Sequence, residues 1–300
     1  MYRDAGTPPS HRGGNGMVTV KAPAKINLAL DTLYKREDNY HEVKMIMTTV
    51  DLADYITVSP LEKDEIRITS DEFNLPRNDK NLAYQAAKLF KKHFNIKKGV
   101  EIQIRKRIPI AAGLAGGSSN AAATLKALRD LWQVPCTLDE LAELGGMIGS
   151  DVPFCVYGGT ALATGRGELI EPLPSPPKCW VILIKPKIGV STKEIYDNLD
   201  AAAGNHFDVD EMVACIQRQD YQGICDLLGN SLEPVTFERY PIVAEIKKKL
   251  IQFGADAVLM SGSGPTVFAL VKKENKLRRI MNSVSGCFRD HDIFAVHLIG

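Results

Sequence analysis

The 300-residue sequence has little net charge, few cysteines and no long apolar run. Its 37 basic and 36 acidic side chains leave a formal net charge of +1. A chain that binds nucleic-acid backbones usually carries a basic excess, so that class of protein is disfavoured. The ordinary apolar content of 45% argues against a disordered chain. At about 100–200 residues per domain, the length predicts two domains or one large domain.

Six cysteines are too few for a disulfide scaffold in a chain of this length. They form no C-x-x-C pair and no cluster with histidine at zinc spacing, so we expect reduced thiols in a cytoplasmic protein. The longest uncharged run that resembles a membrane span, residues 108–125, has a centre rich in glycine and serine. A lipid-facing helix needs about 20 mostly apolar residues, so the sequence predicts no membrane partner.

The chain divides into three segments by composition. Residues 1–16 have no periodicity and many glycine, proline and polar residues, which predicts an added expression leader or a disordered tail. The proline-rich stretch EPLPSPPK at 171–178 predicts a connector between an N-terminal domain, 17–173, and a C-terminal domain, 174–300. Alternating patterns at 65–69 and 101–104 predict strands, and apolar stripes at 81–94 and 119–132 predict helices. Strands and helices alternate without a repeat, which favours an α+β fold.

The strongest local signal is a glycine-rich segment, residues 109–120, between a predicted strand and an alanine-rich helix. Its glycines lack Cβ and let a ligand approach the main chain. Ser118 and Ser119 occupy the position of helix N-caps. Free N–H groups at a helix start attract anions. The segment therefore predicts a phosphate cradle, with a tight packing turn as the alternative. It is neither a Walker A loop nor a G-x-G-x-x-G fingerprint, and no H-R-D or D-F-G motif occurs.

Three further features bear on this hypothesis. A second glycine turn, SGSGPT at 261–266, precedes a predicted strand and fits a plain hairpin equally well. Asp151 follows Gly-Ser and precedes an apolar run, so it is either a turn former or a partly buried carboxylate that needs a partner. Lys25 and Asn27 are expected on one side of a strand. Lys25 is either a snorkelling edge residue or a cation directed into a site, with Asp151 as a candidate partner.

Five segments in this order resemble the GHMP kinases, a family named for galactokinase, homoserine kinase, mevalonate kinase and phosphomevalonate kinase. They are PAKINLAL at 23–30, NYHEV at 39–43, the glycine-rich segment, GSDVPF at 149–154 and the second glycine turn. The resemblance spans roughly residues 18–270 and is strongest to a member that phosphorylates a cytidine diphosphate sugar alcohol for non-mevalonate isoprenoid synthesis. It implies an α+β, two-domain GHMP kinase fold, with an ATP-binding N-terminal domain like domain 2 of ribosomal protein S5. The C-terminal domain would be ferredoxin-like, and the active site would lie in the cleft between the two.

The resemblance also implies roles for individual residues. Lys25 and Asp151 match the catalytic pair, in which the carboxylate takes the proton of the substrate hydroxyl and the lysine offsets phosphoryl charge. The residues matching those that hold the ATP phosphates are Pro109, Gly113, Leu114, Ala115, Gly116, Gly117, Ser118, Ser119 and Asn120. The residues matching the substrate site are Asn27, which positions the substrate, and Tyr40, His41 and Tyr196, which hold the cytosine. ATP and Mg²⁺ are the implied cofactors, with Ser119 as a candidate metal ligand.

The sequence departs from the family at a few positions and leaves alternatives open. Ala111, Ala112 and Ala115 stand where relatives often carry glycine, although a positive φ is unfavourable for alanine. Asn39 replaces a glycine and tolerates the left-handed region better than most residues. Another member of the family, such as a homoserine or mevalonate kinase, is the nearest alternative, and a non-catalytic nucleotide sensor or an RNA-binding module is the alternative of another class. We expect small-molecule partners, no nucleic acid, and a monomer or homodimer.

Overall fold

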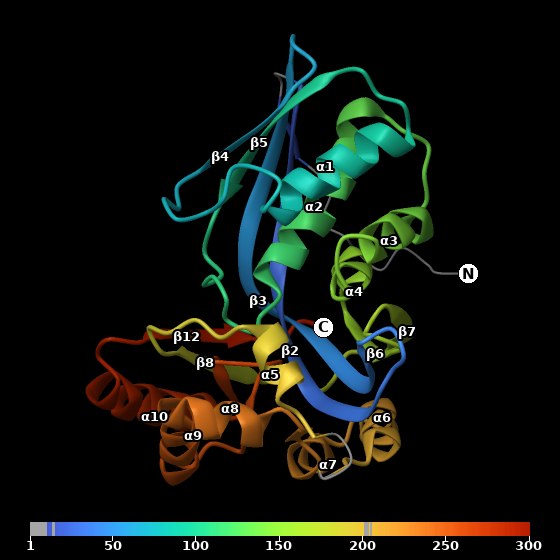
Figure 1. Cartoon of the computed structure of the whole chain (residues 1–300). Helices are drawn as coiled ribbons and strands as arrows, with labels where there is room; N and C mark the ends of the chain where they lie inside the picture. Colours follow the sequence, from blue (N-terminus) through green and yellow to red (C-terminus); the bar gives the residue numbers. More distant parts are fainter. Residues whose placement is uncertain (1–10, 14–15, 201–203, 205) are drawn as a thin grey trace. The chain divides into compact units, whose positions relative to one another are not determined.

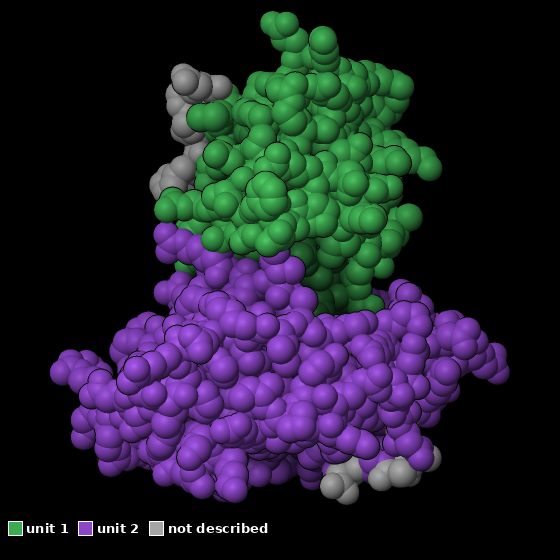
Figure 2. All heavy atoms as spheres, turned by 60° about the vertical axis from the view of Figure 1, so that its left-hand side comes forward, with its two compact units in different colours: residues 1–22, 54–106, 117–156 green, residues 23–53, 107–116, 157–300 purple. Residues whose placement is uncertain are grey.

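The computed structural model describes residues 11–13, 16–200, 204 and 206–300 (Figure 1). The chain forms two compact units (Figure 2): residues up to 22 with 54–106 and 117–156, and residues 23–53 with 107–116 and 157–300. The strands β2 (Met17–Lys35) and β3 (His41–Leu61) contribute to both units. This division differs from the boundary at residue 173, which stays a prediction. None of the helices in the described ranges has the length and apolar character that a membrane span requires.

Most of the predicted leader, residues 1–10 and 14–15, lies outside the described residues. Its residues His11–Gly13 form the short strand β1, which pairs antiparallel with the start of β2. In this pairing His11 lies opposite Thr19 and Gly13 lies opposite Met17. These three residues therefore extend the sheet edge, which the sequence pattern did not indicate.

The first unit combines part of a sheet with four helices. Strands β4 (Ile66–Ser70) and β5 (Gly99–Arg105) pair in parallel, and the second half of β3 pairs antiparallel with β5. The helices are α1 (Leu82–His93), α2 (Gly116–Trp132), α3 (Leu138–Gly146) and α4 (Val152–Tyr157). Helix α1 contacts β4 and α3 (Figure 1). The predicted helices at 81–94 and 119–132 are confirmed, and Thr137 with Glu140 forms a capping box at the start of α3.

The second unit contains a four-stranded antiparallel sheet in the order β10-β11-β8-β12. Its strands are β8 (Trp180–Lys185), β10 (Ala257–Met260), β11 (Val267–Val271) and β12 (Asp292–His297). Helices separate β8 from β10 and β11 from β12, so the chain order and sheet order are those of the predicted ferredoxin-like fold. Figure 1 shows α8 (Glu233–Arg239), α9 (Pro241–Gln252) and α10 (Glu274–Cys287) on one side of this sheet.

The same unit also holds a hairpin and a helical segment. Strands β6 (Thr160–Thr164) and β7 (Leu169–Leu173) form a hairpin that pairs with Met45–Thr48 of β3, and the sequence did not predict it. The elements between β8 and α8 are α5 (Thr192–Asp197), α6 (Val209–Gln217), α7 (Tyr221–Asp226) and β9 (Gly229–Asn230). Strand β9 pairs in parallel with β2. Figure 1 shows these elements in yellow to orange.

The core of the second unit joins distant parts of the chain. Ile26 and Leu28 of β2 pack in one apolar cluster with Leu183 of β8 and Phe268 of β11. Three residues from the start of the glycine-rich segment and its approach belong to the same cluster: Ile108, Ala112 and Leu114. Burying each such side chain contributes about 1–3 kcal/mol. This packing fixes the backbone of the segment to β2 and to the four-stranded sheet.

Candidate active site

Hydrogen bonds hold the carbonyl groups of the glycine-rich segment. Three successive carbonyls accept bonds from β2 and the second glycine turn: Ala112 from the Thr266 N–H (3.3 Å), Gly113 from Ser261 Oγ (3.0 Å) and Leu114 from the Lys25 N–H (3.1 Å). Two segments more than 80 residues away on either side therefore fix this backbone. These three carbonyl oxygens therefore have hydrogen-bond partners within the protein.

The N–H groups of the same stretch are not committed. Among the described residues, none accepts a hydrogen bond from the backbone N–H of Gly113, Leu114 or Ala115. Helix α2 starts at Gly116, so Ser118 and Ser119 lie in its first turn and not at the N-cap position expected for them. The first N–H groups of a helix have no partner within it. A run of open N–H groups at the positive end of a helix dipole attracts an anion. The geometry thus supports the phosphate cradle over a turn that serves packing alone.

The backbone of this stretch lies close to the second glycine turn and contains residues with strained φ angles. Gly113 has a φ of +77°, and a Cβ added to it would lie 2.3 Å from the Ser261 carbonyl oxygen, so only glycine fits there. Ala111 and Ala115 adopt φ values of 50° and 55°, each in the left-handed region. That conformation costs an L-residue roughly 1–2 kcal/mol. The alanines therefore keep the conformation that glycine adopts without cost, and Asn39 does the same with a φ of 67°.

Lys25 and Asn27 lie together on β2, as their spacing predicted. Lys25 is 4% exposed and its Nζ donates to Asn27 Oδ1 at 2.7 Å. A lysine this deeply buried is not a snorkelling surface residue. Asn27 is fully buried, and its amide points its Nδ2 at Met45 Sδ, 3.4 Å away. A Cβ on Gly262 would lie 3.7 Å from Asn27 Oδ1, so the second glycine turn lies against this pair.

Asp151 belongs to the first unit, where it precedes α4. Its carbonyl accepts the Cys155 N–H at 3.2 Å, which starts the helix. A Cβ on Gly145 of α3 would lie 2.7 Å from Val152 Cγ1, so this glycine allows α4 to start close to α3. Lys25 belongs to the other unit. The pairing of Lys25 with Asp151, and the cleft that would contain it, stay predictions.

Three ring side chains near the turn after β2, Tyr40, His41 and Tyr196, are called the aromatic group below. The rings of His41 and Tyr196 lie with centroids 5.3 Å apart and planes tilted by 37°. His41 is buried, whereas the neighbouring Tyr40 is 52% exposed. Burial lowers the pKa of His41 below its ordinary value; Lys35 acts in the same direction and Asp197 opposes both. The imidazole is therefore neutral near pH 7 and offers one donor and one acceptor, as recognition of a base edge requires.

The aromatic group is linked to the glycine-rich segment through the second glycine turn. Tyr196 lies on the short helix α5, which Ser191 caps by accepting the Glu194 N–H. Thr192 Oγ1, at the start of the same helix, lies 2.8 Å from Ser263 Oγ. Because Ser261 of that turn bonds to Gly113, one turn connects both parts.

A buried charge at the start of α2 was not predicted from the sequence. Asp54 of β3 is fully buried, forms an ion pair with Lys106, and accepts Asn120 Nδ2 at 2.8 Å. The side chain of Asn120, a predicted phosphate-binding residue, is thus directed to Asp54. The sequence carries little signal for Asp54, because β3 also contains the charged residues Glu42, Lys44 and Asp51, and charged side chains are usually exposed.

No metal cluster accompanies these residues. Within the described ranges, no three or more His, Cys, Asp or Glu side chains come together in a way that could hold a metal ion. Ser119, the candidate metal ligand, is 2% exposed in the first turn of α2. None of the six cysteines, all of which lie in the described ranges, forms a disulfide bond.

Family models match the two halves of the chain separately. The GHMP kinases N terminal domain matches residues 81–159, and the GHMP kinases C terminal domain matches residues 212–290. A protein from Geobacillus kaustophilus (strain HTA426) is 62% identical over 284 residues, which cover 94% of this chain and 97% of that protein. The chain belongs to the GHMP kinases. It is a small-molecule kinase, and the resemblance inferred from the five sequence segments is confirmed.

Other GHMP kinases show the same pattern. The Geobacillus relative and one from Bacillus cereus (strain B4264), 60% identical over 94% of this chain and 96% of its own, are both named 4-diphosphocytidyl-2-C-methyl-D-erythritol kinase. A crystal structure of 4-(cytidine 5'-diphospho)-2C-methyl-D-erythritol kinase matches with a TM-score of 0.78 at 32% identity, covering 94% of this chain and 99% of that one. A homoserine kinase from Cytophaga hutchinsonii matches with a TM-score of 0.77 at 21% identity, covers 97% of each chain, and shares the fold.

Proposed function

We propose that this kinase transfers the γ-phosphoryl group of ATP to the 2-hydroxyl of 4-diphosphocytidyl-2-C-methyl-D-erythritol. The products are the 2-phosphate and ADP, and the reaction belongs to non-mevalonate isoprenoid precursor biosynthesis. The names of relatives about 60% identical support this substrate. The structural observation that carries the proposal is the second glycine turn, which bonds to both the glycine-rich segment and the helix of Tyr196.

ATP phosphates suit the open N–H groups of the glycine-rich segment. Phosphoryl transfer depends mainly on positioning and on stabilising charge over the phosphoryl oxygens. The N–H groups from Gly113 to Ala115 and the start of α2 supply fixed dipoles, and buried Lys25 supplies a positive charge. Mg²⁺ bound by ATP needs few protein ligands, since its other positions are taken by phosphate oxygens and water. The hydroxyl of Ser119, without a cluster of acidic side chains among the described residues, fits a metal held mainly by ATP. Such a metal would neutralise part of the phosphate charge.

The chemical step uses Asp151 and Lys25. Asp151 accepts the proton of the 2-hydroxyl while the oxygen of that group forms a bond to the γ-phosphorus. The bond between that phosphorus and the β–γ bridging oxygen breaks, and ADP leaves with the electron pair. Lys25, held by Asn27, orients the carboxylate and offsets charge on the moving group. Asn27 positions the substrate beside this pair.

The cytosine end of the substrate suits the aromatic group. Neutral His41 can donate to and accept from the edge of a pyrimidine. Tyr40 and Tyr196 supply faces for stacking, which contributes about 1–3 kcal/mol per base in nucleic-acid systems. Homoserine and mevalonate have no base for these rings to hold, so the aromatic group favours the cytidine substrate.

The proposal is tested with a panel of substrates and with a variant that lacks the proposed general base, Asp151. We expect turnover of the cytidine diphosphate substrate with ATP and none of homoserine or mevalonate. Asp151→Asn should lower kcat by about 10²–10⁴-fold because the general base is lost. Its circular dichroism and melting temperature should match those of wild type, and Asp290→Asn, an exposed carboxylate elsewhere, should keep full activity. Near-normal turnover by Asp151→Asn would remove that residue from the mechanism.

The remaining expectations concern the environment of the protein. A cytoplasmic location, the absence of a nucleic-acid partner, and a monomeric or homodimeric state stay predictions. Light scattering during size-exclusion chromatography distinguishes the monomer from the homodimer.

A further inference from the structure

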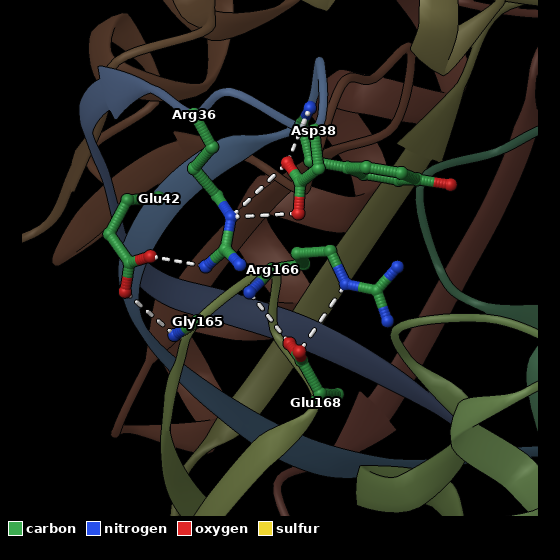
Figure 3. Close-up of polar contacts among 7 residues, drawn as sticks. Arg36, Asp38, Glu42, Gly165, Arg166 and Glu168 are labelled. Carbon is green, nitrogen blue, oxygen red and sulfur yellow. Dashed lines mark hydrogen bonds and ion pairs between the residues drawn. The ribbon is translucent and has the colours of Figure 1, made fainter.

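Two turns of the second unit are joined by a network of charged groups (Figure 3). One turn links β2 to β3 and the other, residues 165–168, links β6 to β7. Arg36 bonds to Asp38 at 3.1 Å and to Glu42 at 2.6 Å. Glu42 reaches the second turn, where its Oε1 accepts the Gly165 N–H at 3.0 Å. The two turns are therefore held in register by side chains and backbone together.

Arg166 on the second turn is fixed by its own neighbour. Glu168 accepts the Arg166 backbone N–H at 2.6 Å and the side-chain Nε at 3.3 Å. Figure 3 shows the Arg166 side chain extending beyond Glu168, with its terminal amino groups pointing away from that carboxylate. In the part of the chain that the structure describes, those amino groups donate no hydrogen bond. The guanidinium is therefore held at its Nε edge by Glu168.

The oriented guanidinium lies over an aromatic ring of the first turn. Arg166 Cζ is 4.8 Å from the centroid of Tyr40, a cation–π distance. The Tyr40 backbone is held as well, since Asp38 accepts its N–H at 3.1 Å and its carbonyl accepts the Arg36 N–H at 2.7 Å. Tyr40 is nevertheless 52% exposed, and Arg166 is a cation that lies over its ring.

We propose that Arg166 is a positioning residue for the substrate base, which acts by holding one face of Tyr40. With that face occupied by the guanidinium, the ring presents its other face to the pyrimidine of the proposed substrate. Fixing the ring before binding removes part of the ordering cost that binding otherwise carries. A planar guanidinium stacks on a ring in a way that a lysine ammonium does not. The inference rests on the proposed function, because Tyr40 must contact the base.

A double-mutant cycle separates this role from direct contact with the substrate. Arg166→Gln should raise KM for the cytidine substrate about three- to ten-fold and leave kcat and the KM for ATP within about two-fold. In a Tyr40→Leu background, Arg166→Gln should add no further change, because the ring that it positions is gone. Arg166→Lys should give a KM for the cytidine substrate between those of wild type and Arg166→Gln. Arg278→Gln, which removes an exposed arginine paired with Glu274 on α10, is the matched control and should change nothing.

Each outcome decides between the alternatives. An equal rise in KM in the wild-type and Tyr40→Leu backgrounds means that Arg166 binds an acidic group of the substrate directly, which overturns the positioning role. An unchanged KM in Arg166→Gln, with wild type active on the cytidine substrate, overturns the inference and leaves the proposed function intact. Failure of wild type to use that substrate overturns the proposed function, and the inference with it. Melting temperatures measured in parallel detect a variant that has merely lost stability.

Discussion

Substituting Gly113 by alanine should damage both the stability of the protein and its binding of ATP. The residue has a φ of +77°, and an added Cβ would lie 2.3 Å from the Ser261 carbonyl oxygen and 3.0 Å from that of Gly264. Both neighbours are backbone atoms of the second glycine turn, so a side-chain rotation cannot relieve the contact. The turn or the glycine-rich segment must move, and the bond from Ser261 Oγ to the Gly113 carbonyl joins them at this point.

The size of the effect follows from two contributions. The left-handed conformation costs alanine roughly 1–2 kcal/mol. Forcing a methyl into a packed site costs typically 1–3 kcal/mol more. Gly158 is the matched control, because it has a φ of +71° and nothing within 4 Å of an added Cβ. Gly158→Ala therefore carries only the conformational cost, and Gly113→Ala should be less stable than it by about 2 kcal/mol.

Thermal unfolding and steady-state kinetics measure both parts of this prediction. At about 2–4 °C per kcal/mol for a protein approaching this size, Gly113→Ala should melt about 4–8 °C below Gly158→Ala. Its KM for ATP should rise about ten-fold or more, since the N–H groups of the segment lose their alignment, while Gly158→Ala keeps the wild-type KM. Equal melting temperatures for the two variants would refute the claim that the second glycine turn closes on Gly113.

Two further predictions test the buried charge and the histidine. Asp54→Asn keeps an acceptor for Asn120 but removes the charge that Lys106 pairs with, so the free energy of unfolding should fall by about 3–5 kcal/mol. Chemical denaturation of the double variant Asp54→Asn, Lys106→Met should show that much of this loss is recovered. No recovery would contradict the buried ion pair between Asp54 and Lys106. Because burial lowers the pKa of His41, the unfolded chain binds more protons than the folded one just below pH 6.5, and stability should fall as the pH is lowered through that window. The KM for the cytidine substrate should rise over the same range, and His41→Asn should flatten both pH profiles; unchanged profiles would exclude His41.

Local patterns in the sequence were sufficient for several elements of the fold. The apolar stripes predicted the helices α1 and α2 to within a few residues, and both are confirmed. The long strand β2 carries a weak signal in the sequence, because a proline, Pro23, stands inside it, and the strand nevertheless runs unbroken from Met17 to Lys35. The hairpin of β6 and β7 was missed, since short strands with little alternation carry a weak signal.

The candidate site divides in the same way. The close approach of the glycines at 113–117 and the i, i+2 spacing of Lys25 and Asn27 depend on residues adjacent in the chain, so their geometry was predictable. The cap position was predicted wrongly, because α2 begins at Gly116 and Ser118 and Ser119 lie inside its first turn. Arg166 gave no such signal, because its partner Tyr40 lies on another turn. Asp54 was hidden for the same reason, since Lys106 and Asn120 reach it only after folding.

The sequence alone determined the family and the ferredoxin-like arrangement, and it supplied the residues to which the proposed chemistry is assigned. Only the tertiary structure decided which backbone groups of the glycine-rich segment remain open to an anion. Its carbonyls are bound by Ser261 and Thr266, about 150 residues later in the chain, and by Lys25, nearly 90 residues earlier. A motif specifies local conformation, but the commitment of each N–H and carbonyl depends on neighbours that folding brings together.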